Sequence, residues 1–269
     1  MQKLKAFVLL LLASSAICNA QFTETINSNR PGQSQGAFAV GTGVYQLEAG
    51  GFYGNDTHEL RKTDTDLYGA NYMLRAGLLT DILELNIQGR YQVEETRIFQ
   101  GGQNRTYERN NFPFNTIGAK LLLYDPYKNG DNRREINIRS WDANQKLDWR
   151  RLIPAVSLYG GANVTLQDEN PYRFVGESKY TPKVTLITQH NWGPWVWVMN
   201  FTAEKFTETY ANYEFIGTLT HAFSPKFAVF GEYQAIIGDI YADDIFRAGG
   251  AYLITDYLQL DVAGLTNAK

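Results

Sequence analysis

Residues 82–91 read ILELNIQGRY, and this stretch decides the fold class. Every second residue is apolar or glycine, and together these form one face: Leu83, Leu85, Ile87, Gly89 and Tyr91. The residues between them form a polar face: Glu84, Asn86, Gln88 and Arg90. Alternation with a period of two predicts a β-strand with two unlike faces. In water this would be a half-buried strand of a sandwich; in an outer membrane the apolar face would meet lipid and the polar face a lumen.

The same alternation recurs along the chain and predicts eleven strands. They cover residues 44–53, 66–78, 82–91, 115–124, 153–165, 181–190, 194–202, 213–221, 227–235, 245–254 and 258–266. Their lengths are near the nine to eleven residues with which a tilted strand crosses a bilayer. Bacterial barrels of this kind have an even number of strands. We therefore predict an all-β fold, an antiparallel transmembrane β-barrel of about 12 strands.

The connections between these strands alternate in length. Short turns at residues 79–81, 191–193, 222–226 and 255–257 alternate with longer loops at 54–65, 92–112, 166–180 and 203–212. Short periplasmic turns and longer outer loops are typical of outer-membrane barrels. Residues 125–151 are long where a short turn is due, which predicts a periplasmic insertion. The alternative is an extra spanning strand, which would invert the topology of everything after it.

The first twenty residues predict export. Lys3 and Lys5 precede a short apolar run at residues 7–12, and small residues stand before Gln21, as in a cleaved signal peptide. Cys18 is the only cysteine, so the mature chain would have neither a disulfide nor thiol chemistry. Ile17 is bulky where a lipobox needs a small residue, which disfavours a lipoprotein. The predicted organisation is a signal peptide at 1–20, a periplasmic or lumenal segment at 21–42, and a barrel at 43–269 that includes the 125–151 insertion.

Composition limits the class of function. The 269 residues carry a net charge of −3, which argues against a nucleic-acid-binding surface. The mean hydropathy of −0.33 is as polar as that of a soluble protein. A β-barrel in a membrane has the same average, because only every second residue of its strands faces lipid. No run of eighteen apolar residues follows the first twenty, so a membrane helix is not expected.

Several stretches resemble one bacterial outer-membrane family, whose label refers to a pathway of phenol degradation. They are NRPGQS at 29–34, VYQLEAG at 44–50, GLLTD at 77–81 followed by LEL at 83–85, IPAV at 153–156, and residues 249–261. The resemblance covers most of the chain; the 125–151 insertion and the lack of a last aromatic strand depart from it. It implies an outer-membrane β-barrel that passes small, often hydrophobic molecules. The label comes from pathway context and implies little about the substrate.

The polar face of the predicted strands supplies the candidate site, which is a lumen. We expect ten charged side chains to face it: Glu48, Arg75, Glu84, Arg90, Lys120, Lys183, Glu214, Glu232, Arg247 and Asp261. They would form either a solute path with ion-selective rings or an internal network of ion pairs that fills a narrow barrel. The network is favoured, because unpaired charges in a confined lumen are costly.

Residues 21–36, which include Arg30, precede the first strand. They would either plug the lumen, with Arg30 paired to an inward carboxylate such as Glu48 or Glu84, or form a periplasmic tail. The sequence leaves both open.

Other residues invite functional readings that the sequence does not favour. Trp192, Trp195 and Trp197 fit an interfacial girdle better than a ligand-stacking cluster. The three histidines lack metal-ligand spacing, so no metal and no cofactor is predicted. Asp243 and Asp244 could bind a cation, although a solvated loop is favoured. The pattern G-x-S-x-G occurs at residues 32–36 (GQSQG), but it precedes the first predicted strand, whereas a nucleophile elbow follows a strand, and only three histidines could supply a base. No catalytic residue and no enzyme activity is therefore predicted.

The function predicted is therefore a channel or transporter for small solutes, hydrophobic or aromatic ones among them, in the outer membrane of a Gram-negative bacterium. Its partners would be membrane lipids, lipopolysaccharide and the solute, with no nucleic acid; the sequence does not give the oligomeric state. The first alternative is a non-conducting structural or partner-binding barrel, in which 125–151 docks a periplasmic protein. The second is an outer-membrane enzyme such as a lipase or protease.

Overall fold

A computed structural model describes residues 28–58, 62–100, 103–129, 139, 149–167, 169–174, 176–239 and 241–268. The expected signal peptide at 1–20 and the start of the 21–42 segment lie outside these residues. The strands are β1 (Tyr45–His58), β2 (Thr63–Gly77), β3 (Leu83–Gln100), β4 (Gln103–Tyr124), β5 (Ala155–Val164), β6 (Tyr180–Trp192), β7 (Trp195–Glu204), β8 (Asn212–Ser224), β9 (Phe227–Gly238), β10 (Asp243–Thr255) and β11 (Leu258–Asn267). Each predicted strand overlaps one of them.

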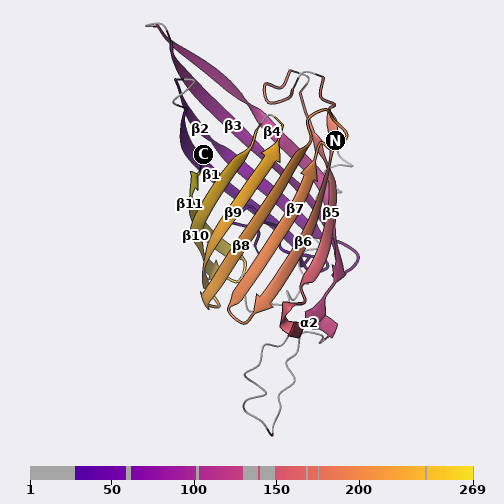
Figure 1. Cartoon of the computed structure of the whole chain (residues 1–269). Coiled ribbons are helices and arrows are strands. Elements are labelled where there is room, and N and C mark those ends of the chain that lie inside the picture. Colours follow the sequence, from indigo (N-terminus) through magenta and orange to yellow (C-terminus); the bar gives the residue numbers. More distant parts are fainter. Residues whose placement is uncertain are drawn as a thin grey trace, which may run out of the picture.

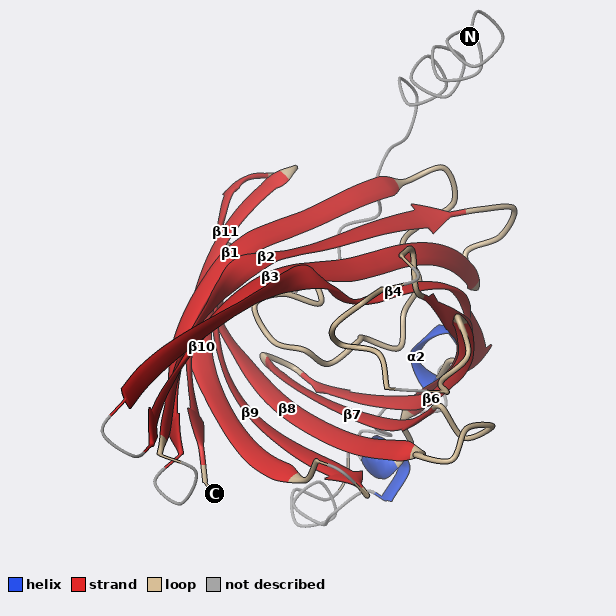
Figure 2. Cartoon of the chain, turned by 90° about the horizontal axis from the view of Figure 1, so that it is seen from above, coloured by secondary structure: helices blue, strands red, loops and turns tan. Residues whose placement is uncertain are grey.

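The strands form one antiparallel sheet in chain order, which curls into a half-barrel (Figures 1 and 2). The predicted all-β, antiparallel fold is confirmed. A closed barrel of about 12 strands is not what the described residues form. They provide eleven strands, and no hydrogen-bonded pairing joins β11 to β1. Ten antiparallel pairings separate these two edges, so β1 and β11 run in the same direction and cannot make the next antiparallel step.

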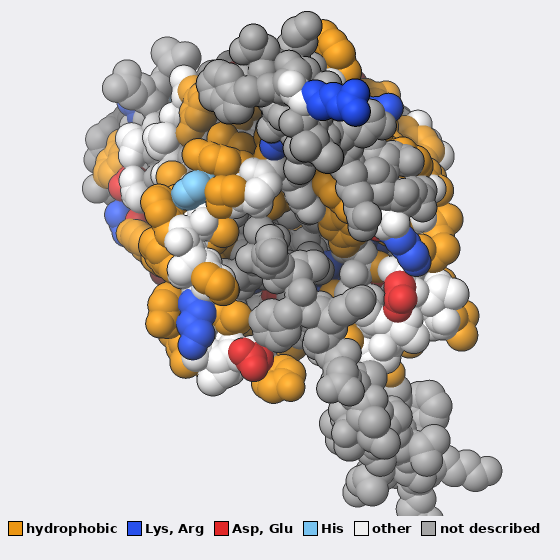
Figure 3. Space-filling model, turned by 90° about the horizontal axis from the view of Figure 1, so that it is seen from below, with side chains coloured by type: hydrophobic (Ala, Val, Ile, Leu, Met, Phe, Trp, Pro, Cys, Tyr) orange, Lys and Arg blue, Asp and Glu red, His pale blue; other side chains and the backbone are white. Residues whose placement is uncertain are grey.

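The sheet buries polar side chains and exposes apolar ones. On β3, Glu84 and Asn86 are 0% and 1% exposed, whereas Leu85 and Ile87 are 41% and 43% exposed. The same reversal runs through most other strands, and hydrophobic side chains gather around the flank of the molecule seen from the α2 end (Figure 3). A soluble protein buries the opposite set. The inner face of the curl is therefore polar and its outer face apolar. No helix among the described residues is long and apolar enough to span a bilayer.

The described ends of residues 125–151 lie beside a tight turn. They contain the short helices α2 (Pro126–Asn129) and η3 (Trp149–Leu152). The backbone N–H of Asn191 donates to the Tyr127 hydroxyl at 2.6 Å, and His190 Nε2 lies 3.0 Å from the carbonyl oxygen of Leu152, next to the β6–β7 turn. Because β4 pairs directly with β5, no strand lies between them in the sheet. The alternative of an extra spanning strand here is therefore wrong.

Two of the predicted long loops are mostly strand. The β1–β2 ladder continues to His58 and Thr63, and the β3–β4 ladder continues to Gln100 and Gln103, so the loops expected at 54–65 and 92–112 are wrong. These strand ends are mostly polar, with isolated apolar residues such as Val93, Ile98 and Tyr107, and therefore lack the regular apolar alternation that marks a strand in sequence. The longer connections after β5 and β7 lie where they were expected.

The apolar outer face predicts how folding responds to a charged side chain placed on the outside of β3. Ile87→Arg places a cation on the apolar outer face in the middle of a strand, where lipid would oppose it by about 2–4 kcal/mol. Thr106→Arg is the matched control, because Thr106 is exposed on the polar extension of β4. We predict that Ile87→Arg lowers the fraction of refolded protein that migrates differently before and after boiling, while Thr106→Arg does not. Equal folded fractions would show that the outer face of β3 does not meet lipid.

Candidate functional site

Charged side chains from four neighbouring strands meet on the inner face near the tight-turn end. Arg75 on β2 lies between two carboxylates, with Nη2 at 2.8 Å from Glu84 and Nη1 at 3.2 Å from Glu48. Lys120 on β4 approaches Glu84 to 3.1 Å. The side chains are at most 4% exposed. Two cations thus share two carboxylates out of contact with water, and each charge depends on the others for its stability.

The register of the sheet produces this cluster. Glu84 stands directly opposite Lys120 in the β3–β4 ladder. Arg75 stands opposite Asn86 in the β2–β3 ladder, and Asn86 is two residues from Glu84 on the same face of β3. Opposite and diagonal neighbours on one face lie close enough for long side chains to touch. Since every second residue faces inward, the alternation that forms the strands also brings these charges together.

Residues 28–41 run along the inner face and supply further hydrogen bonds. The backbone N–H of Val40 donates to Glu84 at 3.0 Å, and the Lys120 ammonium donates to the carbonyl oxygens of Gly36 and Phe38 at 2.9 Å each. Side chains of β5, β6, β7 and β9 bond the same segment: Ser157, Gln189, Asn200 and Glu232. This segment, which we call the inner segment, lies inside the curl and contacts strands on both sides of it.

Arg30 joins the inner segment to both edges of the sheet. Its Nη2 is 3.2 Å from Oδ1 of Asp261 on β11. Its guanidinium also rests on β1, where a Cβ added to Gly50 would lie only 2.1 Å from Nη2. The neighbouring residue Asn29 donates its backbone N–H to Glu48 on β1 at 3.4 Å. Arg30 and Asn29 therefore connect the two strands that do not pair with each other.

The residue that follows the inner segment, Thr42, is fixed at the turn between β2 and β3. Thr42 donates to Asp81 from its hydroxyl at 2.6 Å and from its backbone N–H at 3.2 Å. These bonds lower the pKa of the Asp81 carboxyl, because they stabilise its ionised form.

Comparison with known proteins assigns the chain to a family. A family model described as "Putative MetA-pathway of phenol degradation" matches residues 28–268, which include the inner segment and all eleven strands. The chain belongs to this family. No curated protein matches it. The resemblance that we inferred from the motifs is thereby confirmed.

Most of the ten expected lumen residues of this family member are ion-paired on the inner face. Besides Glu48, Arg75, Glu84, Lys120 and Asp261, Arg247 pairs with Glu232 at 2.9 Å, and Lys183 pairs with Glu204. Glu214 accepts a hydrogen bond from Gln234. Arg90 is different: its Nε donates to Asn71 at 2.7 Å, and no carboxylate among the described residues lies within ion-pair distance.

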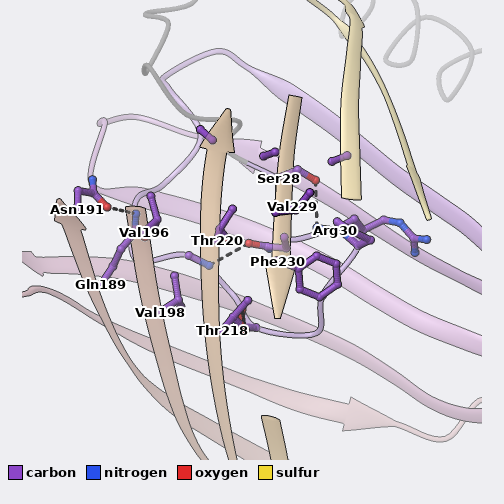
Figure 4. A pocket seen from close by; sticks show the side chains of 18 of the residues that line it. Ser28, Arg30, Gln189, Asn191, Val196, Val198, Thr218, Thr220, Val229 and Phe230 are labelled. Atoms are coloured by element: carbon purple, nitrogen blue, oxygen red, sulfur yellow. Dashed lines mark hydrogen bonds between the residues drawn. The ribbon is translucent and has the colours of Figure 1, made fainter. Parts of the chain in front are cut away.

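The inner segment and strands β6 to β10 line a partly open pocket of about 100 Å³ (Figure 4). Its lining combines polar side chains such as Gln189 and Thr218 with apolar ones such as Val196, Val198 and Phe230. The backbone around Gln33 is held at this pocket by Glu232, which accepts bonds from Gln33 N at 3.0 Å and Thr218 Oγ1 at 2.7 Å.

Some residues of the site were missed or placed differently by sequence analysis. Arg30 pairs with Asp261, not with Glu48 or Glu84, because those two carboxylates already bind Arg75. Four neutral side chains also hold the inner segment: Ser157, Gln189, Asn200 and Thr218. Alternation places them on the polar face of their strands, but the expected lumen residues comprised charged side chains alone.

Two further clusters lie away from the inner segment. Trp192, Trp195 and Trp197 contact the His190 and His221 rings near the β6–β7 turn. The solvated-loop reading of Asp243 is wrong, because its buried carboxylate accepts bonds from the Tyr241 hydroxyl at 2.5 Å and from Asn267 Nδ2 at 2.7 Å. The described residues contain no group of three or more histidine, cysteine or acidic side chains that could hold a metal ion.

The charge cluster predicts a large cost for removing its central carboxylate. Glu84→Gln leaves Lys120 and Arg75 buried with too little negative charge, and we predict that it lowers the free energy of unfolding by about 3–5 kcal/mol. Asp64→Asn is the control, because its ion pair with Arg97 is exposed and such pairs are worth about 0–1 kcal/mol. Urea unfolding in lipid vesicles, followed by tryptophan fluorescence, measures both. Equal effects would mean that the cluster is not buried in the folded protein.

Proposed function

We propose that the protein is an outer-membrane channel for small solutes and that the inner segment occupies its lumen in the resting state. The observation that carries this proposal is the polar, charged inner face of the curled sheet beneath an apolar outer face. A sheet with that arrangement suits a bilayer outside and a solute path inside. Membership of the phenol-degradation family is compatible with transport of small hydrophobic or aromatic molecules.

The proposed location is the outer membrane of a Gram-negative bacterium, which makes lipids and lipopolysaccharide the partners of the apolar face. The predicted signal peptide supports this location. No nucleic acid and no catalytic reaction is part of the proposal. Ser157, which faces inward, already donates its hydroxyl to the backbone carbonyl of Ala37 and has no histidine as a hydrogen-bond partner among the described residues.

The inner segment is proposed to be a plug that leaves the lumen when the channel opens. It is held by hydrogen bonds, by the ion pair of Arg30 with Asp261, and by a small apolar cluster in which Ala37 and Phe38 pack with Ile187 and Val198. Individual hydrogen bonds contribute about 0.5–1.5 kcal/mol each, so removal of one contact should shift the segment only in part. A pocket lies between it and strands β6 to β10, so the segment does not fill this part of the interior completely.

Conductance of the segment variants tests the proposal. We predict that deletion of residues 28–40 raises single-channel conductance in planar bilayers while boiling still changes the migration of the protein. Arg30→Ala should raise the open probability to a smaller extent, because it removes only the link to Asp261. Lys226→Ala is the matched control, since Lys226 lies in an exposed turn away from the inner segment.

The alternative, a non-conducting structural barrel, predicts a different outcome. The internal ion pairs favour it, because they stabilise a filled interior. In that case the folded deletion variant would conduct no better than the parent protein, and the transport proposal would be withdrawn.

A further inference from the structure

Arg90 is the exception among the charged residues of the inner face. Each of the other four cations expected there pairs with a carboxylate: Arg75, Lys120, Lys183 and Arg247. Arg90 has a single side-chain hydrogen bond, from Nε to Oδ1 of Asn71. Within the described residues, its two terminal amino groups have no hydrogen-bond partner and no ion-pair partner. A guanidinium with these donors free is a group suited to a carboxylate, which it can bind with two parallel bonds.

Two aromatic rings flank this guanidinium. Its central carbon lies 4.9 Å from the ring centroid of Phe52 on β1 and 5.9 Å from that of Phe114 on β4. Phe114 pairs with Arg90 in the β3–β4 ladder, so the two side chains lie on the same face. Phe52 is aligned, through Gly69, with Gln92, which is two residues from Arg90 on β3, so Phe52 also lies on that face. Room for the Phe52 ring exists because residue 69 is glycine, where a Cβ would lie 2.9 Å from the ring. The rings hold the guanidinium plane and offer apolar surface beside it.

The charges nearby do not neutralise Arg90. Arg90 is largely buried, and a second cation acts on it, Arg247 on β10, whose carboxylate partner Glu232 also accepts bonds from the inner segment. This part of the inner face therefore carries an excess of positive charge. A cation left without a partner on an otherwise paired face is costly, and an arriving anion would remove that cost.

The position of Arg90 suits a solute that enters from the end opposite the tight turns. Arg90 lies six residues beyond Glu84 on β3, or about 20 Å along the strand. Glu84 binds the inner segment at Val40, whereas Arg30 of the same segment rests on Gly50, in the row of paired residues that includes Asn71 and Arg90. A solute that comes from the other end therefore meets Arg90 and the start of the segment at the same level.

We propose that Arg90, Phe52 and Phe114 form a binding site for a small aromatic carboxylate. The carboxylate would bind the two free amino groups of Arg90, and its ring would pack against Phe52 and Phe114. This inference rests on the proposed function, because it names the class of solute that the lumen selects. No bond is made or broken in the process.

Binding of benzoate to the refolded full-length protein in detergent, measured by equilibrium dialysis, tests the site. We expect saturable binding to the parent protein and a loss of about tenfold or more in affinity in Arg90→Gln, since a charged hydrogen bond is worth about 1.5–3 kcal/mol. Arg97→Gln is the matched control, because Arg97 lies on the same strand but is exposed and paired with Asp66; its affinity should equal that of the parent. Benzyl alcohol has the same ring without the charge, and Arg90→Gln should not change its binding.

Two further variants cover the case in which Arg90→Gln does not fold. Arg90→Lys keeps the charge and should bind benzoate with intermediate affinity. Phe52→Leu should lower the affinity for benzoate more than the affinity for acetate. Absence of saturable benzoate binding to the folded parent, or equal affinity in Arg90→Gln, would overturn the site. If acetate binds as tightly as benzoate, the proposed contact of the ligand's ring with Phe52 and Phe114 is overturned.

This measurement needs no ion flow, so its failure is separable from failure of the channel. A protein that conducts but does not bind benzoate would refute the Arg90 site alone. A folded protein that binds benzoate at Arg90, but does not conduct even without residues 28–40, would refute the channel alone.

Discussion

Buried charge on the inner face of the sheet is the constraint on which the rest of this structure depends. A strand that turns its apolar side outward must turn polar side chains inward, and those side chains then need partners out of contact with water. Glu84 shows how the need is met: it binds Arg75, Lys120 and the backbone of Val40. The first two partners come from neighbouring strands, and the third comes from the inner segment. The segment is thus part of the solution that makes a polar interior stable.

The inner segment also bears on the one discontinuity of the sheet. β1 and β11 run in the same direction and share no ladder, so their edges leave backbone groups without sheet partners. Arg30 contacts both edges, through Asp261 on β11 and over Gly50 on β1. A plug that leaves the lumen would therefore also release this connection. The proposed opening of the lumen would therefore be coupled to loosening of the contact between β1 and β11, because Arg30 takes part in both.

Sequence analysis predicted the strands well because the pattern that it used has a direct physical cause. An apolar outer face and a polar inner face require alternation, and residues 82–91 show it. Prediction failed where the alternation becomes irregular: the extensions of β3 and β4 beyond residue 91 and before residue 115 are mostly polar and were taken for a loop. Closure of the barrel is not confirmed by the described residues, because alternation indicates which way a strand faces and not the neighbour with which it pairs.

The candidate site was predictable in part. Alternation predicts which side chains face inward, so the residues that form the Arg75 cluster could be named. The association of Arg30 with an inward carboxylate was one of two alternatives, and it followed from the charge of Arg30. The choice of Asp261 could not be predicted, because it depends on how the curl brings β11 next to β1. The isolation of Arg90 was also hidden, since five cations and five carboxylates suggest complete pairing. Glu204, which follows the predicted seventh strand, instead takes Lys183, and Glu214 is left with Gln234.

The central claim is that residues 28–41 lie inside the curl, and a disulfide tests it most directly. The backbone of Gln35 donates to Asn200 at 2.6 Å and accepts from it at 2.9 Å, so the two residues are close enough for cysteines to be cross-linked. Phe201, the next residue of β7, is 47% exposed on the outer face. In a Cys18→Ser background, mild oxidation of the folded protein should link Gln35→Cys to Asn200→Cys and should not link Gln35→Cys to Phe201→Cys, as read by mass spectrometry of the digested protein. Absence of the first link, or equal yields of both, would contradict the account.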